Sequence, residues 1–230
     1  GFSGLDLGAA LRGPFKGMAE GEVQAAANGE SFAKLAQSLA GTGHMRALNL
    51  AIAGHDAGAL ERLLATPLTG SSAADAATTT RRLEAELQKG TLLLPEVKTP
   101  LVLIDGTLRL GPTRQEGEGV RHDLSGSYDM ARLTGDFRVQ TALTTSPEGW
   151  RGAVPMFIAQ WRGAAGAWSR SLSVEQIINA HLAAALQRDA DQREIQEQDL
   201  RERAYFNRRF KAMEWEKRQR ETLPAPAAGQ

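Results

Sequence analysis

Between Leu92 and Leu143 apolar residues recur at every second position, the spacing typical of strands with one apolar and one polar face. Asp105-Gly106, Ser125-Gly126 and Thr134-Gly135 interrupt or introduce the runs and favour tight antiparallel connections. The pattern predicts three one-faced strands. Their apolar side is formed by Val102, Ile104, Leu108 and Leu110, by Val120, Leu124, Tyr128 and Met130, and by Phe137, Val139 and Leu143.

Before this region the chain alternates between strand and helix patterns. Period-two segments end near Ala27 and run over residues 44–53, and each is followed by a short amphipathic pattern. Ser31 and Asp56 are the expected caps of these two helices. Residues 66–82 are rich in Ala, Ser and Thr and predict a loop or a helix start that becomes regular only at Leu83.

The C-terminal third predicts one more strand and a long helix. The strand region from Trp150 to Trp161 contains Pro155, which favours an edge strand or a strand start. Residues 163–171 are typical of a turn-rich connector. No proline or glycine then interrupts the chain before Pro224. We expect the first helical turns to lie on the sheet through four apolar residues spaced four apart, Val174, Ile178, Leu182 and Leu186.

Together these elements predict an α+β fold. Its parts are a mainly antiparallel, curved sheet that forms an open groove, short crossover helices and a long C-terminal helix. The expected organisation is a β-groove with short helices over residues 1–165, the helix over 166–222 and a disordered tail over 223–230.

Composition and charge exclude several classes of function. Lys+Arg and Asp+Glu are both 27, so no net positive field favours nucleic acid, and we expect no nucleic-acid partner. The absence of cysteine excludes thiolate metal sites, iron–sulfur clusters and cysteine nucleophiles. The common nucleotide-binding, hydrolase and metalloprotease motifs are missing as well. We therefore expect no enzyme activity, no cofactor and no metal.

Two histidine–aspartate pairs are the remaining candidates for a metal site. His55-Asp56 and His122-Asp123 resemble metal-phosphohydrolase ligands, but neither pair has further ligands nearby in the sequence. His122 and Asp123 also fall on opposite faces of a predicted strand. Solvated polar positions are the favoured interpretation of both histidines.

The apolar strand faces are the main candidate site. Only two short amphipathic helices and 6% aromatic residues are present to cover several apolar faces, and an uncovered apolar face favours a ligand or a partner. The predicted groove residues are Val102, Ile104, Leu108, Leu110, Leu124, Tyr128, Phe137 and Val139.

Two segments resemble the C-terminal region of the AsmA-like family, of the alphaproteobacterial type. The first runs from Gly29-Glu30-Ser31 through a short helix and Gly41-Thr42-Gly43 to Asp56. The second, Leu103 to Leu143, is similar to the family's D-G-x-L strand, its L-x-G-x-x-D strand and its D-F-x-V alternation. The similarity continues through Pro155-Met156-Phe157 and Trp161-Arg162-Gly163 into the helix.

The resemblance implies a periplasmic protein anchored in the inner membrane of Gram-negative bacteria. It implies a long β-groove that shields phospholipid acyl chains, or those of another envelope lipid, in transport between membranes and outer-membrane biogenesis. The chain begins Gly1-Phe2-Ser3 without an initiator methionine, so we expect a fragment whose anchor lies upstream. The alternative function is a non-catalytic scaffold for outer-membrane assembly, with its sheet face covered by protein.

The C-terminal helix offers a second candidate contact. Residues Arg201 to Arg220 contain eight Lys/Arg against three Glu, whereas the preceding turns are acidic. A solvated helix is the favoured interpretation, and an interfacial helix at a membrane surface, or one that contacts an envelope protein, is the functional one. The residues that would make such a contact are Phe206, Arg208, Arg209, Phe210 and Met213.

Overall fold

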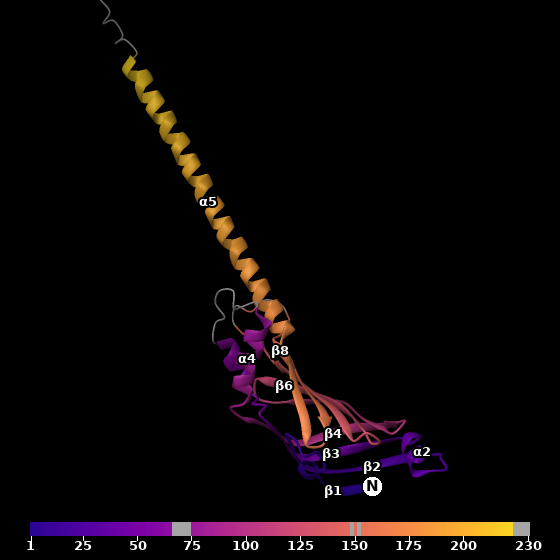
Figure 1. Ribbon diagram of the computed structural model, residues 1–230. Coiled ribbons are helices and arrows are strands. Elements are labelled where there is room, and N and C mark those ends of the chain that lie inside the picture. Colours follow the sequence, from indigo (N-terminus) through magenta and orange to yellow (C-terminus); the bar gives the residue numbers. More distant parts are fainter. Residues whose placement is uncertain (66–74, 148–149, 151–152, 223–230) are drawn as a thin grey trace, which may run out of the picture. The chain divides into compact units, whose positions relative to one another are not determined.

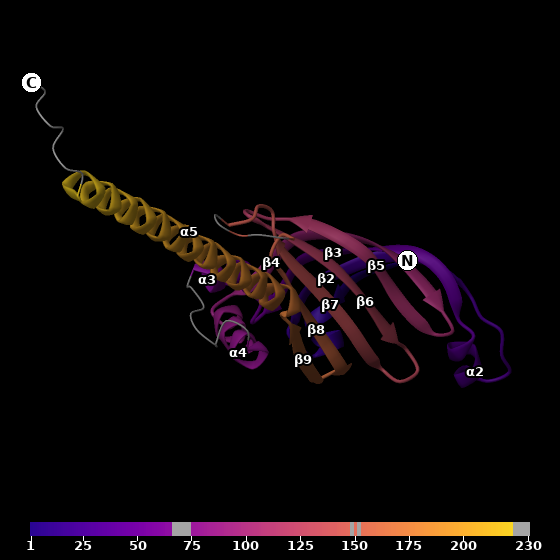
Figure 2. The same ribbon diagram turned by 90° about the horizontal axis from the view of Figure 1, so that it is seen from above.

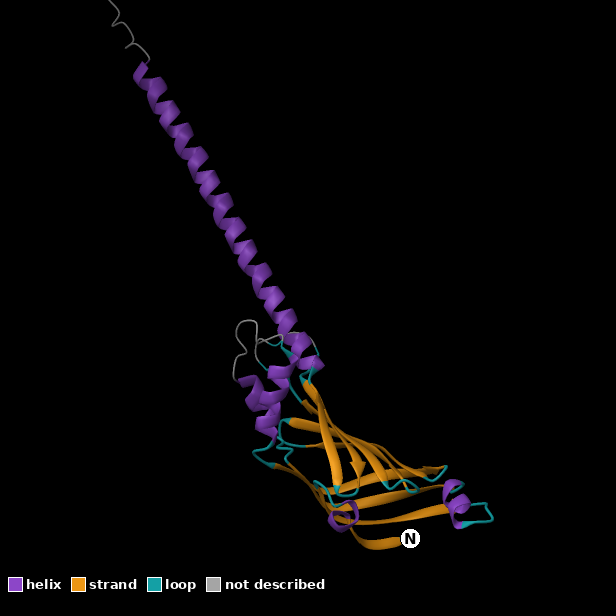
Figure 3. Cartoon of the chain, in the orientation of Figure 1, coloured by secondary structure: helices purple, strands orange, loops and turns teal. Residues whose placement is uncertain are grey.

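A computed structural model describes residues 1–65, 75–147, 150 and 153–222. The chain divides into two compact units, Gly1–Ala183 and Ala184–Gln230. The first is an α+β unit and the second continues the C-terminal helix (Figures 1 and 3). The α+β class, the antiparallel sheet, the short helices and the long C-terminal helix predicted from the sequence are confirmed. The expected tail over residues 223–230 and the loop residues 66–74 lie outside the described residues.

One nine-stranded sheet forms the first unit. Every strand pairs antiparallel with the next one along the chain, so the order in space is the order in sequence, β1 to β9. Figure 2 shows β5 to β9 side by side in this order. The strands are β1 (Phe2–Asp6), β2 (Phe15–Ala26), β3 (Ala40–Ala53), β4 (Thr91–Ile104), β5 (Thr107–Glu116), β6 (Val120–Asp129), β7 (Thr134–Leu143), β8 (Met156–Ala164) and β9 (Ala167–Ser173).

In the described part of the chain, five helices interrupt or follow the strands. They are α1 (Leu7–Leu11), α2 (Phe32–Gln37), α3 (Ala59–Ala65), α4 (Ala76–Leu87) and α5 (Glu175–Thr222). Ser31 caps α2, as expected, by accepting a hydrogen bond from the backbone N–H of Lys34. Asp75 caps α4 in the same way through the N–H groups of Ala77 and Thr78.

Two strand predictions need correction. The tight connection favoured at Asp105-Gly106 is present, with positive φ at both residues, but it divides the first predicted strand into two, β4 and β5. The turn-rich connector expected over 163–171 is a hairpin in which β9 pairs with β8. β8 is therefore not an edge strand, although it does begin directly after Pro155.

The two faces of the sheet differ in polarity. The outer face carries ion pairs, among them Arg46 with Glu20 at 3.1 Å and with Glu96, and Arg162 with Asp136 at 2.8 Å. The inner, concave face is apolar. At one end of the strands α3 and α4 cover it through Leu60, Leu63, Leu83 and Leu87. A one-sided core is the arrangement expected for an antiparallel sheet with alternating strands.

The curvature of the sheet brings its first and last strands together across the concave face. Phe15 of β2 contacts Phe137 of β7, Trp161 of β8 and Trp168 of β9, with ring centroids 5.2, 5.5 and 6.0 Å apart. The carbonyl of Leu11 in α1 accepts hydrogen bonds from Trp168 Nε1 at 2.8 Å and from the N–H of Gly166. We call the four rings of Phe15, Phe137, Trp161 and Trp168 the aromatic seam.

The expected contact between α5 and the sheet is only partly correct. Val174 and Ile177 are buried in the core, and Ile178 is partly buried against it. Leu182, in contrast, is 46% exposed and Leu186 is 62% exposed. Val174, directly before the helix, and the first turn of α5 therefore join the core, because buried residues need a facing surface and not merely four-residue spacing.

Candidate functional site

A groove on the uncovered part of the concave face is the candidate site. It encloses about 260 Å³ between α1 and strands β1 to β7. Its large apolar side chains are mostly half-buried, which means that the described protein leaves them partly uncovered. The side chains that line it on the apolar face are Leu5, Leu7, Leu11, Phe15, Met45, Leu50, Ile52, Val97, Leu108, Leu110, Leu124, Tyr128, Phe137 and Val139.

The threonines in the groove offer little to a polar ligand. The hydroxyl of Thr99 donates to the carbonyl of Gly111 at 3.1 Å, and that of Thr113 donates to the carbonyl of Lys98 at 3.3 Å. Ser125 and Arg138 also border the groove, but they pair with each other between groove-facing positions, so their side chains belong to the outer face. The groove is therefore chemically suited to hydrocarbon.

Six of the eight predicted groove residues lie together in this groove: Leu108, Leu110, Leu124, Tyr128, Phe137 and Val139. Sheet pairing places them on one face, since Leu108 pairs with Tyr128 and Leu124 with Val139. The bulge between Leu110 and Thr113 keeps this face continuous along β5.

Val102 and Ile104 do not line the groove, which corrects their assignment. They are 38% and 43% exposed on the outer face, whereas their neighbours Leu101 and Leu103 are buried. In the two-residue hairpin Leu103 pairs with Leu108, so the inward positions change from odd to even numbers across the turn. Treating residues 102–110 as one strand placed Val102 and Ile104 on the wrong face.

More than half of the apolar side chains that line the groove were not predicted from the sequence: Leu5, Leu7, Leu11, Phe15, Met45, Leu50, Ile52 and Val97. The first four lie in the glycine-rich N-terminal segment. The register between β2 and β3 shifts once, between Lys16 and Met18, opposite Asn49, whose positive φ brings both Ala47 and Leu50 to the inner face. Plain alternation cannot follow the inner face of β3 across this bulge, because the bulge reverses the facing of the residues after it.

His55 and His122 are buried, which contradicts the expectation of solvated side chains. The hydroxyl of Thr141 lies between them, 3.1 Å from His55 Nε2 and 3.0 Å from His122 Nδ1. Burial lowers the pKa of His55 to about 3 and that of His122 to about 4, so both rings are neutral near pH 7. Among the described residues, no cluster of three or more His, Cys, Asp or Glu side chains could hold a metal ion.

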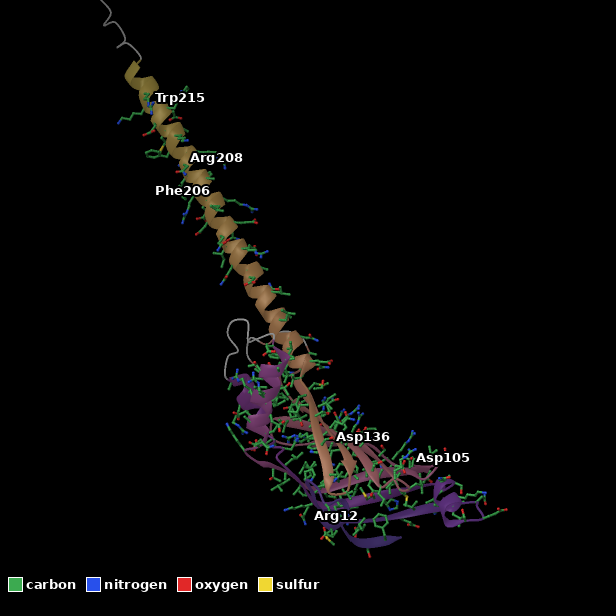
Figure 4. The ribbon with its side chains drawn as sticks, viewed as in Figure 1. Arg12, Asp105, Asp136, Phe206, Arg208 and Trp215 are labelled. Atoms are coloured by element: carbon green, nitrogen blue, oxygen red, sulfur yellow. The ribbon has the colours of Figure 1, made fainter. Side chains whose placement is uncertain are left out.

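The candidate contact residues of the C-terminal helix lie in the second unit, Ala184–Gln230. Phe206, Phe210 and Met213 are 62%, 58% and 54% exposed. Arg208 and Arg209 are exposed as well, and Figure 4 labels Phe206 and Arg208 on the helix. Every described side chain from 189 to 218 is exposed. In the described part of the chain, no helix has a stretch that is both long and apolar enough to span a membrane.

Comparisons with protein-family models, with curated proteins and with solved structures found no match to this chain.

Proposed function

We propose that this chain is a lipid-binding module whose concave sheet face holds a phospholipid acyl chain, or that of another envelope lipid, in the groove. The observation that carries the proposal is a continuous, half-buried apolar surface whose threonine hydroxyls are already hydrogen-bonded to backbone carbonyls. Transfer of hydrocarbon from water to such a surface contributes roughly 0.8 kcal/mol per CH2 group.

A lipid fits this surface better than a protein partner does. A peptide segment in the groove would bring backbone N–H and C=O groups, each of which costs free energy when it is buried without a partner. Strands β2 to β7, which form most of the groove, are paired on both sides and leave such a segment no free strand edge there among the described residues. An acyl chain makes no such demand, which is why we rank lipid binding above the scaffold function.

We propose that the setting is the one implied by the AsmA-like resemblance: a non-catalytic periplasmic protein, anchored to the inner membrane, that serves lipid transport and outer-membrane biogenesis. A curved antiparallel sheet around an apolar groove is the architecture that this resemblance implies, and its presence supports the proposal. We further propose that Phe206, Arg208, Arg209, Phe210 and Met213 contact an anionic membrane surface, because exposed aromatic and basic side chains lie side by side there.

Native mass spectrometry of the full 230-residue chain with extracted envelope phospholipids tests the function. Leu110→Asp and Leu124→Asp should reduce lipid occupancy at least tenfold, because each places a carboxylate in the groove. Val102→Asp and Ile104→Asp are matched controls on the outer face of the same sheet and should bind as the parent does.

Circular dichroism of each variant shows whether the sheet is intact. Equal occupancy in all four variants, or no lipid bound by the parent chain, would overturn the proposal. Loss of folding in both groove variants but in neither control would favour the scaffold function, in which protein covers this face.

A further inference from the structure

The aromatic seam closes one end of the groove. Phe15 and Phe137 both line the groove and stand 5.2 Å apart, edge to face. Trp161 and Trp168 contact Phe15 but do not line the groove, and Trp168 also contacts Phe137 at 5.5 Å, so the two phenylalanine rings separate both indoles from the groove. A groove between two limbs of a curved sheet ends where side chains from the two limbs touch, and the seam is that contact.

On the far side of the seam from the groove, buried side chains of the core fill the concave face. Trp161 is 3% exposed and contacts the ring of His55 at 5.6 Å, and His55 in turn contacts Phe157 at 5.6 Å. Leu60 and Leu83 of the covering helices complete this core, and none of these residues lines the groove. No described path therefore leads an acyl chain from the groove past the seam.

Backbone contacts hold the seam in place. Trp168 Nε1 donates to the carbonyl of Leu11, which fixes the indole ring against the end of α1. A Cβ atom at Gly13 would lie 2.4 Å from the Trp168 ring, so the chain passes this ring only because Gly13 has no side chain. The hydrogen bond also uses the indole N–H, which leaves no free donor there for a polar head group.

From this geometry we infer that the groove is blind. It takes a single acyl chain with the terminal methyl group at the aromatic seam and the polar head group at the opening, and the seam limits the length of chain that it encloses. The inference rests on the proposed lipid binding and defines its ligand as one hydrocarbon chain of bounded length. This unit thus ends a lipid path and does not pass lipid through.

Bromine quenching of tryptophan fluorescence locates the methyl end. In a Trp150→Phe, Trp215→Phe background only Trp161 and Trp168 of the four tryptophans report, and both belong to the seam. Lysophosphatidylcholine brominated near the end of its chain should quench this emission at least twofold more than the isomer brominated near the ester. Equal quenching by the two isomers, or stronger quenching by the second, would overturn the inference.

Chain length provides the second arm of the test. Affinity of the full chain for saturated lysophosphatidylcholines, below micelle formation, should rise about fourfold per added CH2 group and then level off. Phe15→Ala should move the plateau to longer chains, and Phe15→Leu replaces it if the alanine variant does not fold. A rise that continues to stearoyl in the parent protein would show an open passage.

The two hypotheses fail differently. If the parent protein binds no member of either probe series, the proposed lipid binding itself is wrong. If it binds them without a plateau and without end-selective quenching, lipid binding stands and only the blind groove is wrong.

Discussion

The covered and the open halves of the concave face are built from the same strands, but their side chains are buried to different extents. On β7, Leu143 is 7% exposed, whereas Phe137 is only half-buried. Both share one face by alternation. The difference arises from α3 and α4, whose apolar side chains lie over one end of the strands and leave the other end uncovered. Alternation therefore defines a face but not what covers it.

The largest expected effect compares leucines in the two halves. Leu92→Ala, in the covered half, should lower the free energy of unfolding by about 2–5 kcal/mol, because it leaves a cavity in a filled core. Leu110→Ala, in the open groove, should cost about 1 kcal/mol, since its side chain is only half-buried. Leu93 is 70% exposed on the outer face, and Leu93→Ala is the control, with an effect within about 0.5 kcal/mol.

Urea unfolding of the three leucine variants at neutral pH measures these differences. If Leu92→Ala and Leu110→Ala lowered the free energy of unfolding equally, the open half would have to be covered in solution, and the proposed difference between the two halves would be wrong.

The second prediction concerns pH and the histidines of the covered half. His55 and His122 have pKa values of about 3 and about 4 in the folded protein, against 6.5 for an ordinary histidine. The unfolded chain therefore binds more protons below pH 6.5, and the folded state loses stability as the pH falls from 6.5 to about 4. At about 1.4 kcal/mol per pKa unit, His122 alone accounts for roughly 3–4 kcal/mol.

Unfolding midpoints across this pH range test the linkage. His122→Asn should flatten the pH dependence, and His44→Asn, an exposed control, should leave it unchanged. A slope that His122→Asn does not alter would assign the acid sensitivity to carboxylates instead.

The third prediction isolates the hydroxyl between the two rings. Thr141→Val keeps the side-chain volume but leaves His55 Nε2 and His122 Nδ1 without their partner. Buried polar groups without a partner cost about 1–3 kcal/mol, and differential scanning calorimetry should register a corresponding loss. Thr144→Val is the exposed control. If both variants melt with the parent protein, the hydroxyl contributes nothing to the covered half.

The smallest effect on stability is expected in the second unit, where apolar side chains have no described cover. Phe206→Ser with Phe210→Ser should change the free energy of unfolding by less than about 0.5 kcal/mol, because both rings are already exposed. Binding of the full chain to anionic vesicles should nevertheless weaken, and added salt should weaken it further. Leu200→Ser is a control on another side of the helix. Equal binding to neutral and anionic vesicles would reject the electrostatic contribution.

Local patterns were sufficient to predict the class of fold and much of the groove. Alternation from Val120 to Leu143 identified β6 and β7 with the correct inner face, because the side-chain period of two holds within any uninterrupted strand. The long run without proline or glycine identified α5 in the same way. These properties depend on neighbouring residues alone, so the sequence by itself determined them.

Tertiary structure decided the rest. The two-residue turn at Asp105-Gly106 put Val102 and Ile104 on the outer face, and the bulge at Asn49 brought both Ala47 and Leu50 to the inner face. His55 meets Thr141, and Phe15 meets Trp168, only because the sheet curves across itself. Contacts between residues so distant in sequence depend on register, turns and curvature summed over many strands, and no local period encodes that sum.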